Sequence, residues 1–164
     1  MEIKSKNYAK IGFFICAISV MFGAMGKHLI EDVVSSYYLD VFETAVRYQF
    51  IHGLAISFLA LNYRKLNDKY LQYILPLFIF SILVFSGTLY VLVLFSAFFG
   101  DEFKWLGAFT PLGGAGFILG WIMLGIKGFD STDNSTSNDN SSPKRRHKRH
   151  RSSGSHRTSE NSNS

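Results

Sequence analysis

A group of polar residues inside an otherwise apolar segment is the part of this chain best suited to chemistry. Arg47, Gln49 and His52 occur together in the segment 46–63. An imidazole can relay protons because it changes charge between about pH 5 and 8. Ionisable residues at membrane depth are costly, so they indicate a functional site by default. One hypothesis is therefore a small transporter or channel that uses Arg47 and His52.

The alternative for the same residues is structural. Glu43 and Arg47 are spaced i, i+4 and can pair on one helix face, and Tyr48 and His52 share this spacing. Arg47 would then reach the outer interface while bonded to Glu43, and His52 would be a neutral ring bonded to a neighbouring helix. This interpretation, which we favour, predicts that Arg47→Gln lowers stability and that His52→Gln is mild.

A second polar group lies near the middle of the segment 74–99. Ser86, Thr88 and Tyr90 can form hydrogen bonds across a helix interface, and Gly87 allows close helix approach. Interhelical hydrogen bonds in membranes average only about 0.6 kcal/mol. These residues therefore favour a role in packing and helix register, and a substrate path is the alternative.

Glycines are frequent in the last apolar segment and predict a packing face there. Gly113, Gly116 and Gly120 lie on it, and Gly116 with Gly120 forms a small-xxx-small pair. We expect these glycines to let two helix backbones approach closely.

Residue patterns for enzyme chemistry are absent from the sequence. The apolar segments hold no pair of carboxylates, the spacing of zinc ligands does not occur, and no phosphate-binding G-x-x-x-x-G-K-[ST] motif is present. Cys16 is the single cysteine. We therefore expect no enzyme activity, no metal and no cofactor.

Four apolar segments must position these side chains: 11–26, 46–63, 74–99 and 111–126. A helix rises about 1.5 Å per residue, so about 20 mainly apolar residues cross the bilayer core. The pattern predicts an all-α protein, a bundle of four transmembrane helices over residues 1–128. A cleaved signal peptide is the alternative for the first segment, but the residues after it lack an A-x-A cleavage site.

Charges in the gaps between these segments alternate in sign. The leader, the second gap and the chain after the fourth segment are basic, with Lys4, Lys6, Lys10, Arg64, Lys65, Lys69 and Lys127. The first and third gaps are mainly acidic, with Glu31, Asp32, Asp40, Glu43, Asp101 and Glu102. Short basic loops remain in the cytoplasm. We therefore expect an integral, multi-pass membrane protein with both termini cytoplasmic.

Local signals suggest where three helix ends lie. Asp40 and Glu43 resemble a capping box, which predicts that the second helix begins at Val41. Thr110, followed by proline, is predicted to cap the last helix. Gly128 is predicted to end that helix in the left-handed conformation.

Several short strings together resemble a known family. They are GAMGKH at 23–28, RYQ at 47–49, HGLA at 52–55, FSGTLY at 85–90, TPLGG at 110–114 and GW at 120–121. In order and spacing they resemble the domain-of-unknown-function family 423, which consists of small four-span membrane proteins. The resemblance covers residues 9–127. One departure is that Met25 and Lys27 stand where the family usually has phenylalanine and alanine. The resemblance supports the fold and implies no established activity.

Residues 129–164 form a polar, basic tail that differs from the rest of the chain. Residues 131–164 contain no large apolar side chain, and this composition predicts disorder. A dense basic cluster contains Lys144, Arg145, Arg146, Lys148, Arg149 and Arg151. Tethered at a membrane, this cluster is expected to meet anionic lipid head groups rather than nucleic acid, and Ser152 and Ser153 are candidate phosphorylation sites. A solvated tail with no specific partner is the alternative.

These observations lead to one functional interpretation. We expect a non-enzymatic membrane protein that packs with the lipid bilayer, with itself as a homo-oligomer, or with another membrane protein. Transport through the polar residues of the second helix remains the alternative.

Overall fold

The computed structural model describes residues 2–129, and within this range it describes all side chains except those of residues 2–3, 27 and 101–104. The predicted disordered tail, its basic cluster and its two candidate phosphorylation sites lie outside the described residues.

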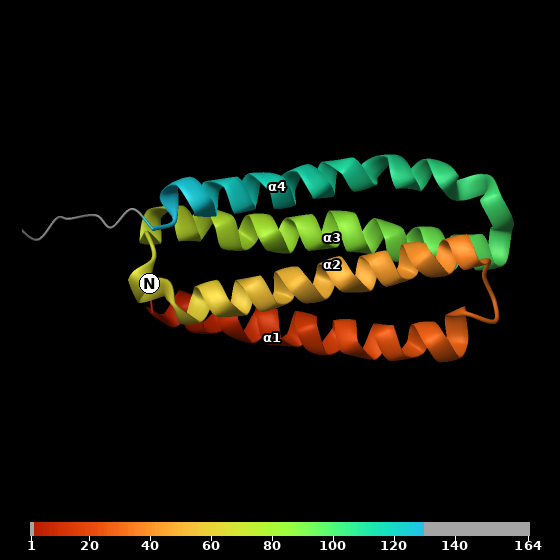
Figure 1. Ribbon diagram of the computed structural model, residues 1–164, viewed down its shortest axis with the longest axis horizontal. Helices are drawn as coiled ribbons and strands as arrows, with labels where there is room; N and C mark the ends of the chain where they lie inside the picture. The colour runs from red at the N-terminus through yellow and green to blue at the C-terminus, as the bar shows by residue number, and fades with distance from the viewer. Residues whose placement is uncertain (1, 130–164) are drawn as a thin grey trace, which may run out of the picture. The chain divides into compact units, whose positions relative to one another are not determined.

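The described chain is built from four long helices (Figure 1). They are α1 (Glu2–Met25), α2 (Ser36–Leu61), α3 (Asp68–Phe99) and α4 (Thr110–Lys127). Short helical turns at Gly26–Ile30, Tyr63–Lys65 and Gly100–Phe109 connect them, and no strand occurs in residues 2–129. The predicted all-α fold is confirmed.

Three of these helical stretches are long and apolar enough to cross a membrane: Lys4–Met25, Asp68–Phe99 and Trp105–Lys127. α2 does not meet this criterion, because Arg47, Gln49 and His52 lower its mean hydropathy. α2 nevertheless runs beside α1 and α3, so its polar residues lie at the same depth as their apolar segments (Figure 1).

The helix ends differ from the sequence signals in three places, two of them at the start of α2 and the end of α4. α2 begins at Ser36 rather than at Val41, because burial extends the helix: Tyr38 and Phe42 are each only 7% exposed. α4 ends at Lys127 as expected, but Gly128 is right-handed, with a φ of −66°, so the predicted left-handed cap is wrong. This backbone lets the Gly128 carbonyl accept a hydrogen bond from the Asn67 backbone N–H at 2.8 Å.

At the start of α4, the prediction that Thr110 caps the helix is wrong. Thr110 is the first residue of the helix, Phe109 occupies the capping position, and no described side chain caps the helix there. The Thr110 hydroxyl is buried and has no hydrogen-bond partner in the part of the chain that the structure describes.

Each helix packs against the next one along the chain, so that α2 and α3 lie between α1 and α4 (Figure 1). The main core consists mostly of residues from α2, α3 and α4, with Ala9 from α1, and its fully buried members include Ile56, Ile74, Leu75 and Phe78. Many large apolar side chains point outward instead; Phe14, for example, is 69% exposed. In a hydrocarbon solvent such exposure carries no hydrophobic penalty, which suits a bundle surrounded by lipid.

Candidate functional site

Gln49 links three helices near the middle of the bundle. Its side-chain amide donates to the Ile15 carbonyl of α1 at 3.1 Å, and its Oε1 accepts from the Tyr90 hydroxyl of α3 at 2.8 Å. Only 6% of Gln49 is exposed. Both ends of the amide therefore have partners, and the side chain fixes the rotation of α2 against its neighbours.

His52 is held between two helices by hydrogen bonds and ring contacts. Its Nε2 lies 3.1 Å from Trp121 Nε1, and its Nδ1 lies 2.8 Å from the Tyr48 carbonyl oxygen. Because an indole N–H only donates, Nε2 must accept, and the proton belongs on Nδ1, where it is donated to Tyr48. The ring is therefore neutral in this arrangement. It also stacks on Phe117 with the centroids 3.6 Å apart.

Serine hydroxyls attach helices to the backbone of α2. Ser86 donates to the Ala45 carbonyl at 2.9 Å, and Ser19 donates to the Val46 carbonyl at 2.7 Å. Thr88 is half-buried, and its hydroxyl forms no hydrogen bond with the described residues.

Arg47 is not part of this network. It is exposed, as is Glu43, and no ion pair joins the two in the described part of the chain. Five residues separate Arg47 from His52, which places them about 140° apart around an ideal helix. The structure therefore brings Gln49 together with Tyr90, and His52 together with Trp121. Arg47 instead lies on the exposed surface of the bundle.

The glycines of α4 form a close contact with α3. A methyl group at Gly113 would lie 2.6 Å from the Phe85 backbone nitrogen, while one at Gly116 or Gly120 would collide with a side chain of α3. Gly87 differs, because a methyl group there would meet nothing within 4 Å. The structure thus uses three of the four predicted glycines for close approach and leaves Gly87 beside open space.

Two further features were missed by the sequence reasoning. Gly12 and Gly53 bring α1 and α2 together, since a methyl group at either would lie within 3 Å of the opposite helix. Trp121 was named only as part of a motif. An indole N–H at membrane depth needs an acceptor, and a neutral histidine at similar depth on another helix is a suitable one. The need of a buried indole N–H for an acceptor could therefore have suggested the Trp121–His52 contact from the sequence.

Fold and site together define a small all-α membrane protein, in which polar side chains join the helices to one another. The chain belongs to the family described as "Protein of unknown function (DUF423)", whose model matches residues 22–114. This confirms the resemblance found in the sequence. The matched range contains the polar residues of α2 and α3.

Named relatives agree with this assignment. The chain is 36% identical over 126 residues to the UPF0382 membrane protein SAB0533 of Staphylococcus aureus (strain bovine RF122 / ET3-1), which covers 76% of this chain and 96% of the relative. It is 35% identical over 126 residues to the UPF0382 membrane protein SSP2132 of Staphylococcus saprophyticus, covering 76% and 98% of the two chains. No solved structure matches the chain. The relatives' names place the protein in a membrane.

Proposed function

We propose that this chain is a non-enzymatic membrane protein that acts through packing and interaction within the bilayer. The observation that carries the proposal is the state of its intramembrane polar groups. Gln49, His52, Ser86 and Tyr90 each have a hydrogen-bond partner on a neighbouring helix. Such groups stabilise one helix arrangement and are not left open to a solute.

Transport is the second candidate, and one observation favours it. Trp121, the hydrogen-bond partner of His52, lines a groove between α2 and α4 that opens sideways, on the exposed surface of the bundle. Against this candidate, Arg47 and His52 do not line a common path, since Arg47 is exposed and His52 is 4% exposed within a stack of rings. Packing therefore accounts for more of the geometry.

A flux measurement distinguishes the two candidates. Wild-type protein in liposomes, given an imposed pH gradient and an internal pH dye, is expected to show no proton flux above that of protein-free liposomes. Small solutes are expected to behave in the same way. A reproducible wild-type flux that His52→Gln abolishes, without loss of folding, would overturn the proposal, because an amide cannot carry a proton between about pH 5 and 8 as imidazole can.

We also propose that the basic end of the bundle faces the cytoplasm. The α1 start, the α2–α3 connection with the first turn of α3, and the α4 end lie at one end of the bundle (Figure 1). The first two of these regions carry Lys4, Lys6, Arg64, Lys65 and Lys69. Basic residues on short connections favour the cytoplasmic side. The acidic residues of the other connections lie at the opposite end.

Cysteine labelling tests this orientation. In a Cys16→Ala background, Asp32→Cys should react with a membrane-impermeant maleimide on intact cells, whereas Lys69→Cys should react only after the cells are opened. Both positions are exposed, so accessibility of the side chain is matched. The chain also contains two sequences of the N-glycosylation acceptor type, Asn134-Ser135-Thr136 and Asn140-Ser141-Ser142. In a secretory-pathway membrane, both should remain without glycan if the orientation is as proposed. The reverse labelling pattern, or a removable glycan, would refute the orientation.

A further inference from the structure

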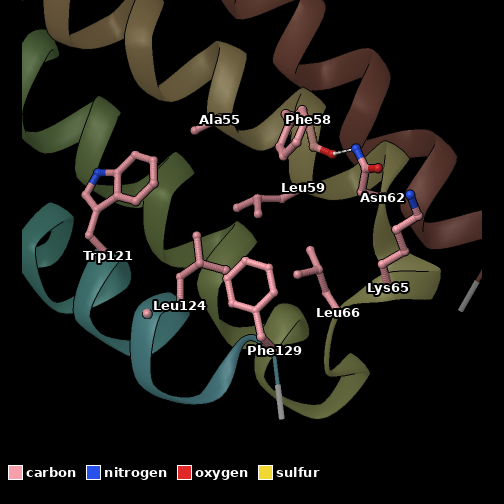
Figure 2. Close-up of a pocket in the computed structure, with 10 residues that line it drawn as sticks. Ala55, Phe58, Leu59, Asn62, Lys65, Leu66, Trp121, Leu124 and Phe129 are labelled. Atoms are coloured by element: carbon pink, nitrogen blue, oxygen red, sulfur yellow. Dashed lines mark hydrogen bonds between the residues drawn. The ribbon is translucent and has the colours of Figure 1, made fainter. Parts of the chain in front are cut away.

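A groove lies between the ends of α2 and α4 (Figure 2). Its volume is about 590 Å³, within the range of small-molecule sites. Its floor is buried, with Leu59 3% and Leu124 7% exposed, while Phe58 and Phe129 on its rim are more than half exposed. The groove therefore opens sideways, toward the solvent that surrounds the bundle. In a membrane that solvent is the hydrocarbon of the lipids.

The groove is apolar along its length and polar at one end. Figure 2 shows Leu59, Leu66 and Leu124 facing one another within it, with Asn62 and Lys65 at one side and Trp121 at the other. Seven residues separate Ala55 from Asn62, which corresponds to about 10 Å along α2. One leaflet contributes about 15 Å of the hydrocarbon core. The groove thus runs through most of one leaflet.

Lys65 sets the charge at the mouth of the groove. It is exposed, and no described side chain forms an ion pair with it. The amide of Asn62 beside it donates to the Phe58 carbonyl at 2.9 Å, which leaves the amide oxygen as the free end of that side chain. Arg64 is turned toward Tyr63, to whose hydroxyl it donates at 3.1 Å. Among the described residues that line this apolar groove, Lys65 is the one cation, and it stands at the end of the groove.

We propose that this groove binds an anionic phospholipid, with one acyl chain against Leu59 and Leu124 and the phosphate at Lys65. The proposal rests on the proposed function, because it names one lipid partner of the bundle. An acyl chain matches the length and apolar floor of the groove, and a negative head group matches its single cationic end. A helix of a second copy would bring apolar side chains along its whole contact and would leave the ammonium without a partner.

Tryptophan fluorescence can report occupancy of the groove. Trp121 lines it, and the other tryptophan, Trp105, lies in the Gly100–Phe109 connection between α3 and α4, at the opposite end of the bundle (Figure 1). In a Trp105→Phe background, the full-length protein would be placed in phosphatidylcholine vesicles, and acyl-brominated phosphatidylglycerol or acyl-brominated phosphatidylcholine would then be added. We expect Trp121 to be quenched at about a fivefold lower fraction of the anionic lipid, the preference that one basic residue near the surface provides.

Two pairs of variants make this result specific. Lys65→Gln should remove the preference for the anionic lipid, whereas Lys69→Gln, which alters an exposed lysine at the same end that does not line the groove, should keep it. Gly125→Leu should fill the groove and weaken quenching by both lipids. Gly87→Leu is its control, because a side chain at either glycine enters open space and only Gly125 lines this groove.

Each result decides the proposal. Equal quenching by the two brominated lipids, or a preference that survives Lys65→Gln, would overturn it. Trp121 fluorescence that neither lipid quenches, with cross-linking between chains through Gly125→Cys, would show a second copy in the groove and would also overturn it. Any of these results leaves the flux prediction intact, so failure of the lipid site is distinguishable from failure of the proposed function.

Discussion

Replacing Gly116 or Gly120 with leucine is expected to prevent most of the protein from reaching its folded state. Side-chain atoms at these positions would meet the Ser81 hydroxyl and the Phe78 ring of α3, and Phe78 is fully buried. Overpacking in a close interface costs about 1–3 kcal/mol, occasionally more. Because α4 would have to move away from α3, the stacking of His52 on Phe117 would be lost as well. We expect a loss of about 3 kcal/mol or more for each variant.

Two control variants on the same helix make the comparison specific. Gly125→Leu introduces the same side chain where a methyl group would meet nothing within 4 Å, and Leu119→Ala removes a side chain that is 56% exposed. Both should keep near wild-type stability in a detergent-unfolding titration and near wild-type abundance in membranes. Equal tolerance of all four substitutions would show that this face of α4 meets lipid and not α3.

Removing the imidazole of His52 should destabilise the bundle far more than altering Arg47. His52→Ala deletes a ring that stacks on Phe117 at 3.6 Å, and it leaves the indole N–H of Trp121 without an acceptor. Loss of a large buried side chain and of one hydrogen bond together cost about 2–4 kcal/mol. Arg47→Gln removes an exposed charge that has no ion pair among the described residues, so its effect should stay within about 0.5 kcal/mol. The sequence alone predicts that Arg47→Gln destabilises the protein more than a change at His52 does, so the structure reverses the expected order of the two positions.

The measurement is the free energy of unfolding of His52→Ala, His52→Gln and Arg47→Gln in one detergent system. His52→Gln should lie between the other two, because an amide can replace the donor and the acceptor but not the ring stack. Intrinsic fluorescence of Trp121 in a Trp105→Phe background provides a second observation, since its environment should change with both His52 variants only. Greater destabilisation by Arg47→Gln than by His52→Ala would contradict the hydrogen-bonded arrangement at α2 and α4.

The all-α fold, the number of helices and the glycine face of α4 could be predicted because each depends on local composition or short spacing. Apolar runs separated by charged gaps identify helices regardless of how they pack. The small-xxx-small spacing of Gly116 and Gly120 places both residues on one helix face, whatever the partner helix is. Helix ends were less predictable: burial of Tyr38 and Phe42 extended α2 beyond the start that the acidic residues suggested.

The partners of the polar side chains were decided by the tertiary structure alone. Gln49 meets Tyr90 across 41 positions of sequence, and His52 meets Trp121 across 69. A periodic pattern shows that such residues share a depth in the membrane, but it does not define how each helix is rotated about its axis. That rotation depends on all the contacts of all four helices at once. It turned Arg47 outward, aimed His52 at α4 and left Gly87 beside open space, three outcomes that the spacing of residues along one helix does not determine.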